Sequence, residues 1–136
     1  MSHPFNFVYS VQSDNDRAAI QQLFDWTVTE YGIHAPAPSV MVVNHEHMQR
    51  AASRSSTGVE ERKHVLGWYA RGHRAVYLSD KVRPSKRISC AGIVVHEIVH
   101  YLQDIIGHCW DMVTMEEEAD WFMMKYVSSP LILTRF

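Results

Sequence analysis

The segment GIVVHEIVHYLQ, residues 92–103, constrains the fold most strongly, because it places ionisable side chains in an apolar setting. His96, Glu97 and His100 lie among aliphatic residues, which are Ile93, Val94, Val95, Ile98, Val99 and Leu102. Burying such groups costs free energy unless charged or hydrogen-bonding partners satisfy them. The chain must therefore fold so that partners for these three groups meet this segment.

The apolar run predicts one long helix over residues 88–106, ended by Gly107. On a helix His96 and His100 share one face, one turn apart, so their imidazoles can bind a single Zn²⁺ at ~2.0–2.1 Å. Glu97 completes the motif HExxH, whose glutamate is the general base of zinc peptidases. The alternative interpretation is a core helix in which both histidines are hydrogen-bonded to the backbone.

A catalytic zinc needs a third protein ligand and keeps one position for water. The metzincin spacing is excluded, because it would require glycine and histidine where Gln103 and Ile106 stand. A last helix is predicted over residues 114–127, and Glu116 and Asp120 share one of its faces. We expect Glu116 to bind the zinc, and Asp120 to accept a hydrogen bond from a ligating histidine.

Other groups stay open as the third ligand. Glu117 or Glu118 would serve if the register of the last helix shifts. Otherwise they are acids of a first turn capped by Thr114, where the helix dipole favours negative charge. His108 and Asp111 come directly after the helix predicted at 88–106 and are further candidates.

Hydrophobic periodicity and turn residues predict the rest of the chain. An amphipathic helix begins at a cap formed by Ser13 or Asp14 and ends at Gly32. The other expected elements are an extended segment at 4–9, a strand at 39–44, a short helix at 45–52, a loop at 53–62, and strands at 64–70 and 73–80 joined by a turn. These elements predict an α+β fold, and a length of 136 residues predicts a single domain, 1–136.

Composition argues against several classes of protein. The net charge of −2 and the lack of a basic run argue against a nucleic-acid partner. No signal peptide or span of ~18–20 apolar residues is visible, so we expect a cytoplasmic protein without membrane association. Cys90 and Cys109 are expected to be free thiols, since a helix would hold them about 24 Å apart.

The order and spacing of these motifs resemble the gluzincin-like ImmA/IrrE metallopeptidases. That family carries HExxH, then E-x-E-A-D/N-x-F roughly 15 residues later, then a proline. Here the matching pieces are HEIVH at 96–100, EEEADWF at 116–122 and Pro130. The upstream GWYARGHRAVYLSD is similar to the family's strand pair, so the resemblance covers roughly residues 64–130.

The resemblance implies a minimal zincin-like domain, in which a small mixed β-sheet packs on the HExxH helix and further helices lie at the N- and C-terminal ends. It also implies Zn²⁺ held by His96, His100 and Glu116. Glu97 would be the general base and Asp120 a supporting residue. The segment KYVSS departs from the family's usual leucine/methionine run, and the chain has no room for a DNA-binding or sensor domain. We therefore expect a stand-alone bacterial or phage enzyme without the family's regulatory roles.

The expected function is that of a zinc endopeptidase acting on a protein or peptide. The alternative is a zincin-fold module that binds metal or a partner without efficient turnover. Strand residues 74–79 are expected to offer an edge to an extended substrate, with an ordinary buried hairpin strand as the alternative. The candidates for stabilising the oxyanion are Tyr77, Tyr101, His73 and His108.

Overall fold

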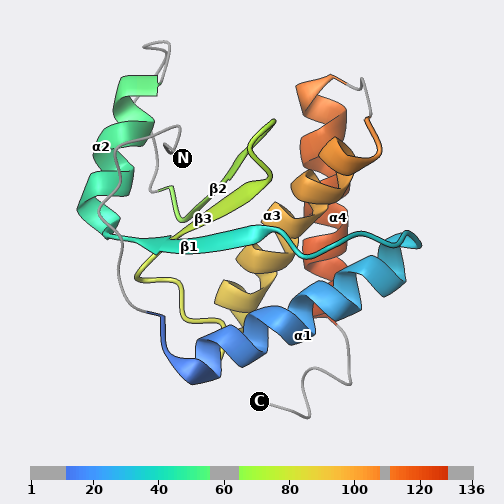
Figure 1. Ribbon diagram of the computed structural model, residues 1–136, viewed down its shortest axis with the longest axis horizontal. Helices are drawn as coiled ribbons and strands as arrows, with labels where there is room; N and C mark the ends of the chain where they lie inside the picture. Colours follow the sequence, from blue (N-terminus) through green and yellow to red (C-terminus); the bar gives the residue numbers. More distant parts are fainter. Residues whose placement is uncertain (1–11, 56–64, 108–110, 129–136) are drawn as a thin grey trace.

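The computed structural model describes residues 12–55, 65–107 and 111–128, which form four helices and three strands (Figure 1). In chain order these are α1 (Asp14–Tyr31), β1 (Ser39–Val43), α2 (His45–Ser55), β2 (Gly67–Ala70), β3 (Ala75–Ser79), α3 (Ile88–Ile105) and α4 (Met112–Val127). This is the small α+β architecture that the sequence predicts. The extended segment expected at residues 4–9 lies outside the described residues.

The three strands form one mixed sheet in the order β1-β3-β2. β3 pairs in parallel with β1 and antiparallel with β2. The expectation that residues 74–79 offer a free edge is therefore wrong, because β3 is the central strand. Every side chain of β3 is buried, and a strand covered on both faces suits the middle of a sheet.

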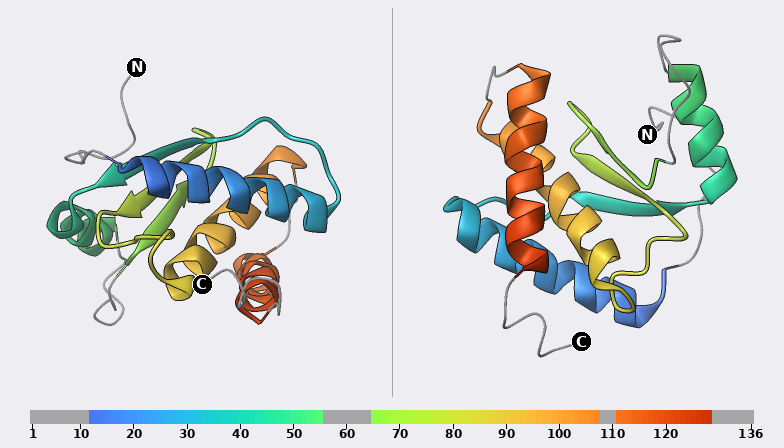
Figure 2. Two further views of the ribbon diagram at one scale, coloured as in Figure 1. Left: turned by 90° about the horizontal axis from the view of Figure 1, so that it is seen from below. Right: turned by 180° about the vertical axis from the view of Figure 1, so that it is seen from behind.

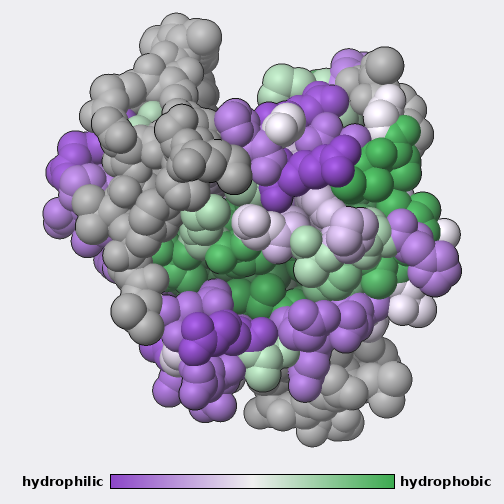
Figure 3. Space-filling view, viewed as in Figure 1, coloured by the Kyte–Doolittle hydropathy of each residue, from purple (hydrophilic) through white to green (hydrophobic). Residues whose placement is uncertain are grey.

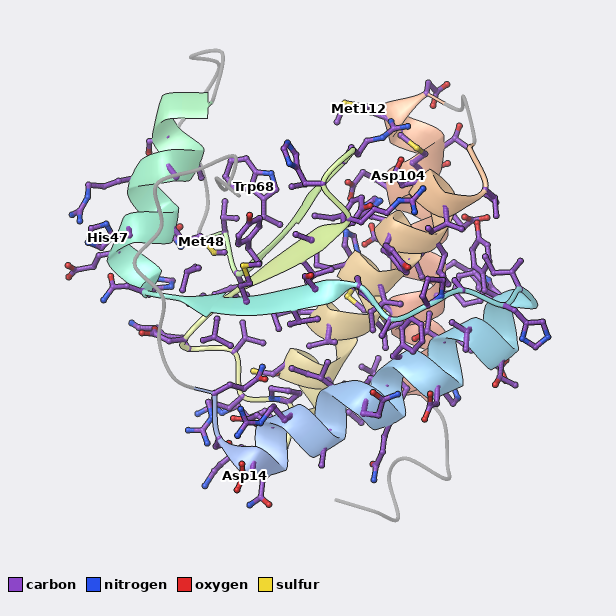
Figure 4. The ribbon with its side chains drawn as sticks, in the orientation of Figure 1. Asp14, His47, Met48, Trp68, Asp104 and Met112 are labelled. Carbon is purple, nitrogen blue, oxygen red and sulfur yellow. The ribbon has the colours of Figure 1, made fainter. Side chains whose placement is uncertain are left out.

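Different helices cover the two faces of the sheet (Figure 1). Val76 and Leu78 of β3 join Tyr69 of β2 in the main core, together with side chains from α1, α3 and α4. Tyr77 faces the other way and packs in a second cluster with Met48 of α2. Figure 4 shows Met48 directed from α2 toward the sheet. The alternation of side chains along β3 thus separates the face that carries α3 from the face that carries α2.

Helix α1 begins and ends where the sequence predicts. The hydroxyl of Ser13 accepts a hydrogen bond from the backbone N–H of Asp16, and Gly32 ends the helix at φ 85°. Its buried side chains include Ile20, Leu23, Phe24 and Thr27. Figure 3 shows polar surface over the outer side of α1 and apolar surface along the line of β1 above it. Helix α1 is therefore amphipathic, as its sequence pattern indicates.

Helix α4 begins earlier than predicted. Asp111, and not Thr114, is its N-cap, because the Asp111 carboxylate accepts a hydrogen bond from the Thr114 N–H at 2.8 Å. Aspartate is a strong capping residue, and its charge is favourable at a helix N-terminus. Glu117 and Glu118 consequently lie beyond the first turn, so the prediction that they stabilise that turn is wrong.

Gly92 allows α3 and α4 to approach closely. A Cβ atom at this position would lie 3.0 Å from Met123 Cγ and 3.0 Å from Val127 Cγ1. The two helices run side by side in opposite directions, with α4 farther from the sheet than α3 (Figure 2).

Among the described helices, none combines the length and apolar character needed to cross a bilayer.

Candidate metal centre

Two antiparallel helices bring the expected ligands together. Helix α3 carries His96 and His100 one turn apart, and α4 supplies Glu116 opposite them. His96 Nε2 lies 3.0 Å from Glu116 Oε1, and His100 Nε2 lies 2.9 Å from Glu116 Oε2. The two Nε2 atoms are 3.2 Å apart. Within the described residues, the ligand atoms of these three side chains lie close enough to one another to bind a single metal ion.

The other acids considered as the third ligand lie elsewhere. Glu117 is exposed on α4. Glu118 accepts hydrogen bonds from Tyr31 and Gln103 and does not belong to the group of side chains that could share a metal ion. Asp111 caps α4, and His108 lies outside the described residues. The register of α4 thus selects Glu116.

The outer nitrogens of both imidazoles also meet side chains. His96 Nδ1 lies 3.0 Å from the carboxylate of Asp120, as expected. His100 Nδ1 lies 2.9 Å from Oε1 of Gln103, a contact that was not expected. All four ring nitrogens therefore face side-chain groups of α3 and α4, whereas the core-helix interpretation placed them against backbone. Gln103 could have been suspected, because it is polar, lies in an apolar helix and follows His100 by three residues.

Glu97 sits beneath the edge of the sheet. It is 7% exposed, and a backbone hydrogen bond from Tyr69 reaches its carboxylate. A Cβ atom at position 67 would lie 2.9 Å from Glu97 Cγ and 3.1 Å from Oε2, so Gly67 leaves the space that this side chain occupies. Burial raises the pKa of Glu97, while the charges of His96 and His100 act in the opposite direction. No pattern in the sequence pointed to the role of Gly67.

The charges of the cluster stabilise one another. Hydrogen bonds from His100 and His96 lower the pKa of Glu116. Burial disfavours the charged form of His96, but the hydrogen bond to Glu116 and the charge of Glu97 outweigh it, so the pKa of His96 is raised. The same balance raises the pKa of His100. The site is thus a pocket of negative potential that favours a cation.

The donor set fits a zinc ion. The Asp120 carboxylate accepts a hydrogen bond from Nδ1 of His96, so the proton that a metal ion would displace from this ring is the one on Nε2, and Nε2 would then offer its lone pair to the ion. Both Nε2 atoms face the carboxylate of Glu116, so one metal ion could replace the protons that now lie between these groups. Two imidazole nitrogens and one carboxylate oxygen are a recurrent ligand set of catalytic zinc, which leaves a fourth position open.

A pocket of about 260 Å³ adjoins the cluster. Its lining comes from β2 and the following turn, from α3 and from the start of α4, and comprises Gly67, Trp68, Tyr69, Arg71, Glu97, His100, Gln103, Met112, Met115 and Glu116. Figure 4 shows Met112 at the start of α4. Arg71, which the sequence did not single out, contributes a positive charge to this lining.

Of the residues considered for oxyanion stabilisation, His108 lies outside the described residues, and the other three do not line this pocket. Tyr77 is fully buried in the cluster beneath α2, and the hydroxyl of Tyr101 donates a hydrogen bond to the Pro36 carbonyl. His73 is exposed in the turn between β2 and β3.

Comparison with protein-family models, with curated proteins and with solved structures finds no match for this chain. A functional interpretation therefore depends on the geometry of the site.

Proposed function

We propose that this chain is a zinc-dependent metallopeptidase that hydrolyses peptide bonds, of the zincin type that its motifs resemble. The observation that carries the proposal is the convergence of His96, His100 and Glu116 on one point, beside the buried carboxylate of Glu97 and at the wall of a pocket. A structural helix would have no need of two imidazoles, two carboxylates and an adjoining pocket at one place.

Each residue then has a defined task. His96, His100 and Glu116 would hold the ion, and a zinc ion there would supply a water of lowered pKa and polarise the substrate carbonyl. Glu97 takes a proton from the attacking water and passes it to the leaving amine nitrogen. Asp120 holds His96 in the orientation that directs Nε2 inward.

The pocket also suggests how a substrate binds. β2 is an edge strand of the sheet, and three of its four residues line the pocket. An extended peptide that pairs with β2 would pass over Glu97 and His100, with the β2 backbone supplying orientation but little sequence preference. This geometry favours a peptide or unfolded segment over a compact protein surface.

The test is a comparison of the wild-type protein with Glu97→Gln, using Glu117→Gln as the matched control on α4. Metal analysis gives the zinc content, and mass spectrometry of a synthetic peptide mixture gives the cleavage rate. We expect about one zinc per chain in all three proteins, and a cleavage rate ~10²–10⁴-fold lower for Glu97→Gln alone. Zinc uptake without cleavage by the wild type would instead favour the metal-binding module, and an absence of zinc uptake would refute both.

A further inference from the structure

Gln103 is buried beside the metal centre, with 2% of its surface exposed. Its amide makes three contacts with protein groups. Oε1 lies 2.9 Å from His100 Nδ1, while Nε2 donates to the carbonyl of Met115 at 3.0 Å and to the carboxylate of Glu118 at 3.0 Å. An amide in so enclosed a place keeps whichever orientation its neighbours impose.

The neighbours impose one orientation. The Met115 carbonyl and the Glu118 carboxylate are both acceptors, so the NH₂ group of Gln103 must face them. Turning the amide over would set its oxygen against two other oxygens and leave buried groups unsatisfied. Oε1 therefore faces His100, and because Oε1 only accepts, His100 must carry a proton on Nδ1. When a metal ion displaces the proton on Nε2, the ring would direct the Nε2 lone pair to the ion that Glu116 also faces.

This arrangement is itself anchored from a third helix. The hydroxyl of Tyr31, on α1, donates to Glu118 Oε1 at 2.7 Å. Glu118 thus receives hydrogen bonds from both Tyr31 and Gln103 and holds the amide in place. The chain of contacts from Tyr31 through Glu118 and Gln103 to His100 connects α1, α4 and α3 around the site.

The two histidines use different partners because their surroundings differ. Asp120, which faces His96, has a side chain that is 58% exposed, so water can solvate its charge. A carboxylate at the buried position 103 would add a further negative charge close to Glu97 and Glu116, at a high desolvation cost. A neutral amide supplies an acceptor without that charge.

We propose that Gln103 is the positioning residue of His100, which fixes the proton on Nδ1 and directs Nε2 toward the metal. The inference rests on the proposed metal site but not on peptide hydrolysis. Loss of such a partner lowers metal affinity by ~10–100-fold in comparable sites. The same residue also ties the ligand geometry to the packing of α1 through Glu118.

The test is the zinc affinity of Gln103→Met, which keeps the length of the side chain and removes its polar atoms. Zinc Kd is measured by competition with a chromophoric chelator, the cobalt(II) absorption spectrum reports ligand geometry, and circular dichroism reports folding. Thr27→Val is the matched control, because Thr27 is buried and its hydroxyl donates to the Leu23 carbonyl away from the site. We expect a 10–100-fold higher zinc Kd and an altered cobalt spectrum for Gln103→Met, and wild-type values for the control. Wild-type values for Gln103→Met would overturn the proposal.

A second measurement needs no variant. Nitrogen-15 NMR of the imidazoles in the wild-type protein shows which ring nitrogens carry protons, with and without zinc. We expect Nδ1 of His100 to carry a proton in both states and zinc to bind through Nε2, whereas an unprotonated Nδ1 in the metal-free protein, or zinc bound through Nδ1, would overturn the proposal. A wild-type protein that binds zinc but cleaves no peptide would refute the proposed function and leave this inference to be decided by these two measurements.

Discussion

Gly67→Ala is the substitution that tests most sharply how the sheet positions Glu97, the proposed general base. The added Cβ would lie 2.9 Å from Glu97 Cγ, 3.1 Å from Glu97 Oε2 and 3.2 Å from Ile93 Cγ2. Ordinary contacts between such atoms are about 3.5–4.0 Å, so the Glu97 side chain must move by roughly 0.5–1 Å. A misplacement of ~1 Å can cost ~10²-fold in rate, and overpacking of this kind costs ~1–3 kcal/mol of stability.

We therefore expect Gly67→Ala to lower kcat by about 10–100-fold while its zinc content stays at the wild-type level, because the three proposed ligands lie on other elements. The assay combines peptide cleavage with metal analysis. Gly92→Ala is the informative contrast, since its Cβ meets Met123 and Val127 of α4 and not Glu97. That variant should lose stability and zinc affinity through displacement of α4. A Gly67→Ala protein with wild-type kcat would refute the assigned position of Glu97.

Three further predictions concern stability and metal binding. Burial would raise the pKa of Asp16, but hydrogen bonds from Ser85 and Arg83 lower it from 3.8 to about 2, which corresponds to about 2.5 kcal/mol of stability above pH 4. Denaturant unfolding of Asp16→Asn should show a loss of about that size at pH 7. The difference from wild type should shrink as the pH falls from 4 to 2; a constant difference would contradict this. Asp120→Ala should raise the zinc Kd roughly tenfold in chelator competition, the low end of the usual range because the side chain is half exposed; an unchanged Kd would contradict its role. Zinc at 100 times its Kd should stabilise the fold by about 2.7 kcal/mol in the same unfolding assay, and EDTA should remove the whole of that gain.

The parts of this structure that depend on local spacing could be predicted from the sequence. His96 and His100 share a face because four residues make about one helical turn. The ends of α1 follow from the capping preferences of Ser13 and Gly32, which act within a few residues. The pairing of Glu116 with Asp120 on one face follows from the same periodicity, once the last helix is recognised.

The parts that depend on distant segments could not be predicted. β3 is central because it pairs with β1, whose sequence lies more than 30 residues away, and the hydrophobic pattern of one strand does not reveal its neighbours. The role of Gln103 depends on acceptors supplied by α4, and that of Gly67 depends on where α3 passes beneath β2. These contacts are set by packing, which no local pattern encodes.

The binding of a metal ion at the convergence of α3 and α4 is best measured by anomalous diffraction at the zinc absorption edge, from crystals grown with zinc. The proposal predicts a single strong peak bounded by Nε2 of His96, Nε2 of His100 and the carboxylate of Glu116. A zinc-supplied crystal without a peak there, or with its peak at other side chains, would contradict it.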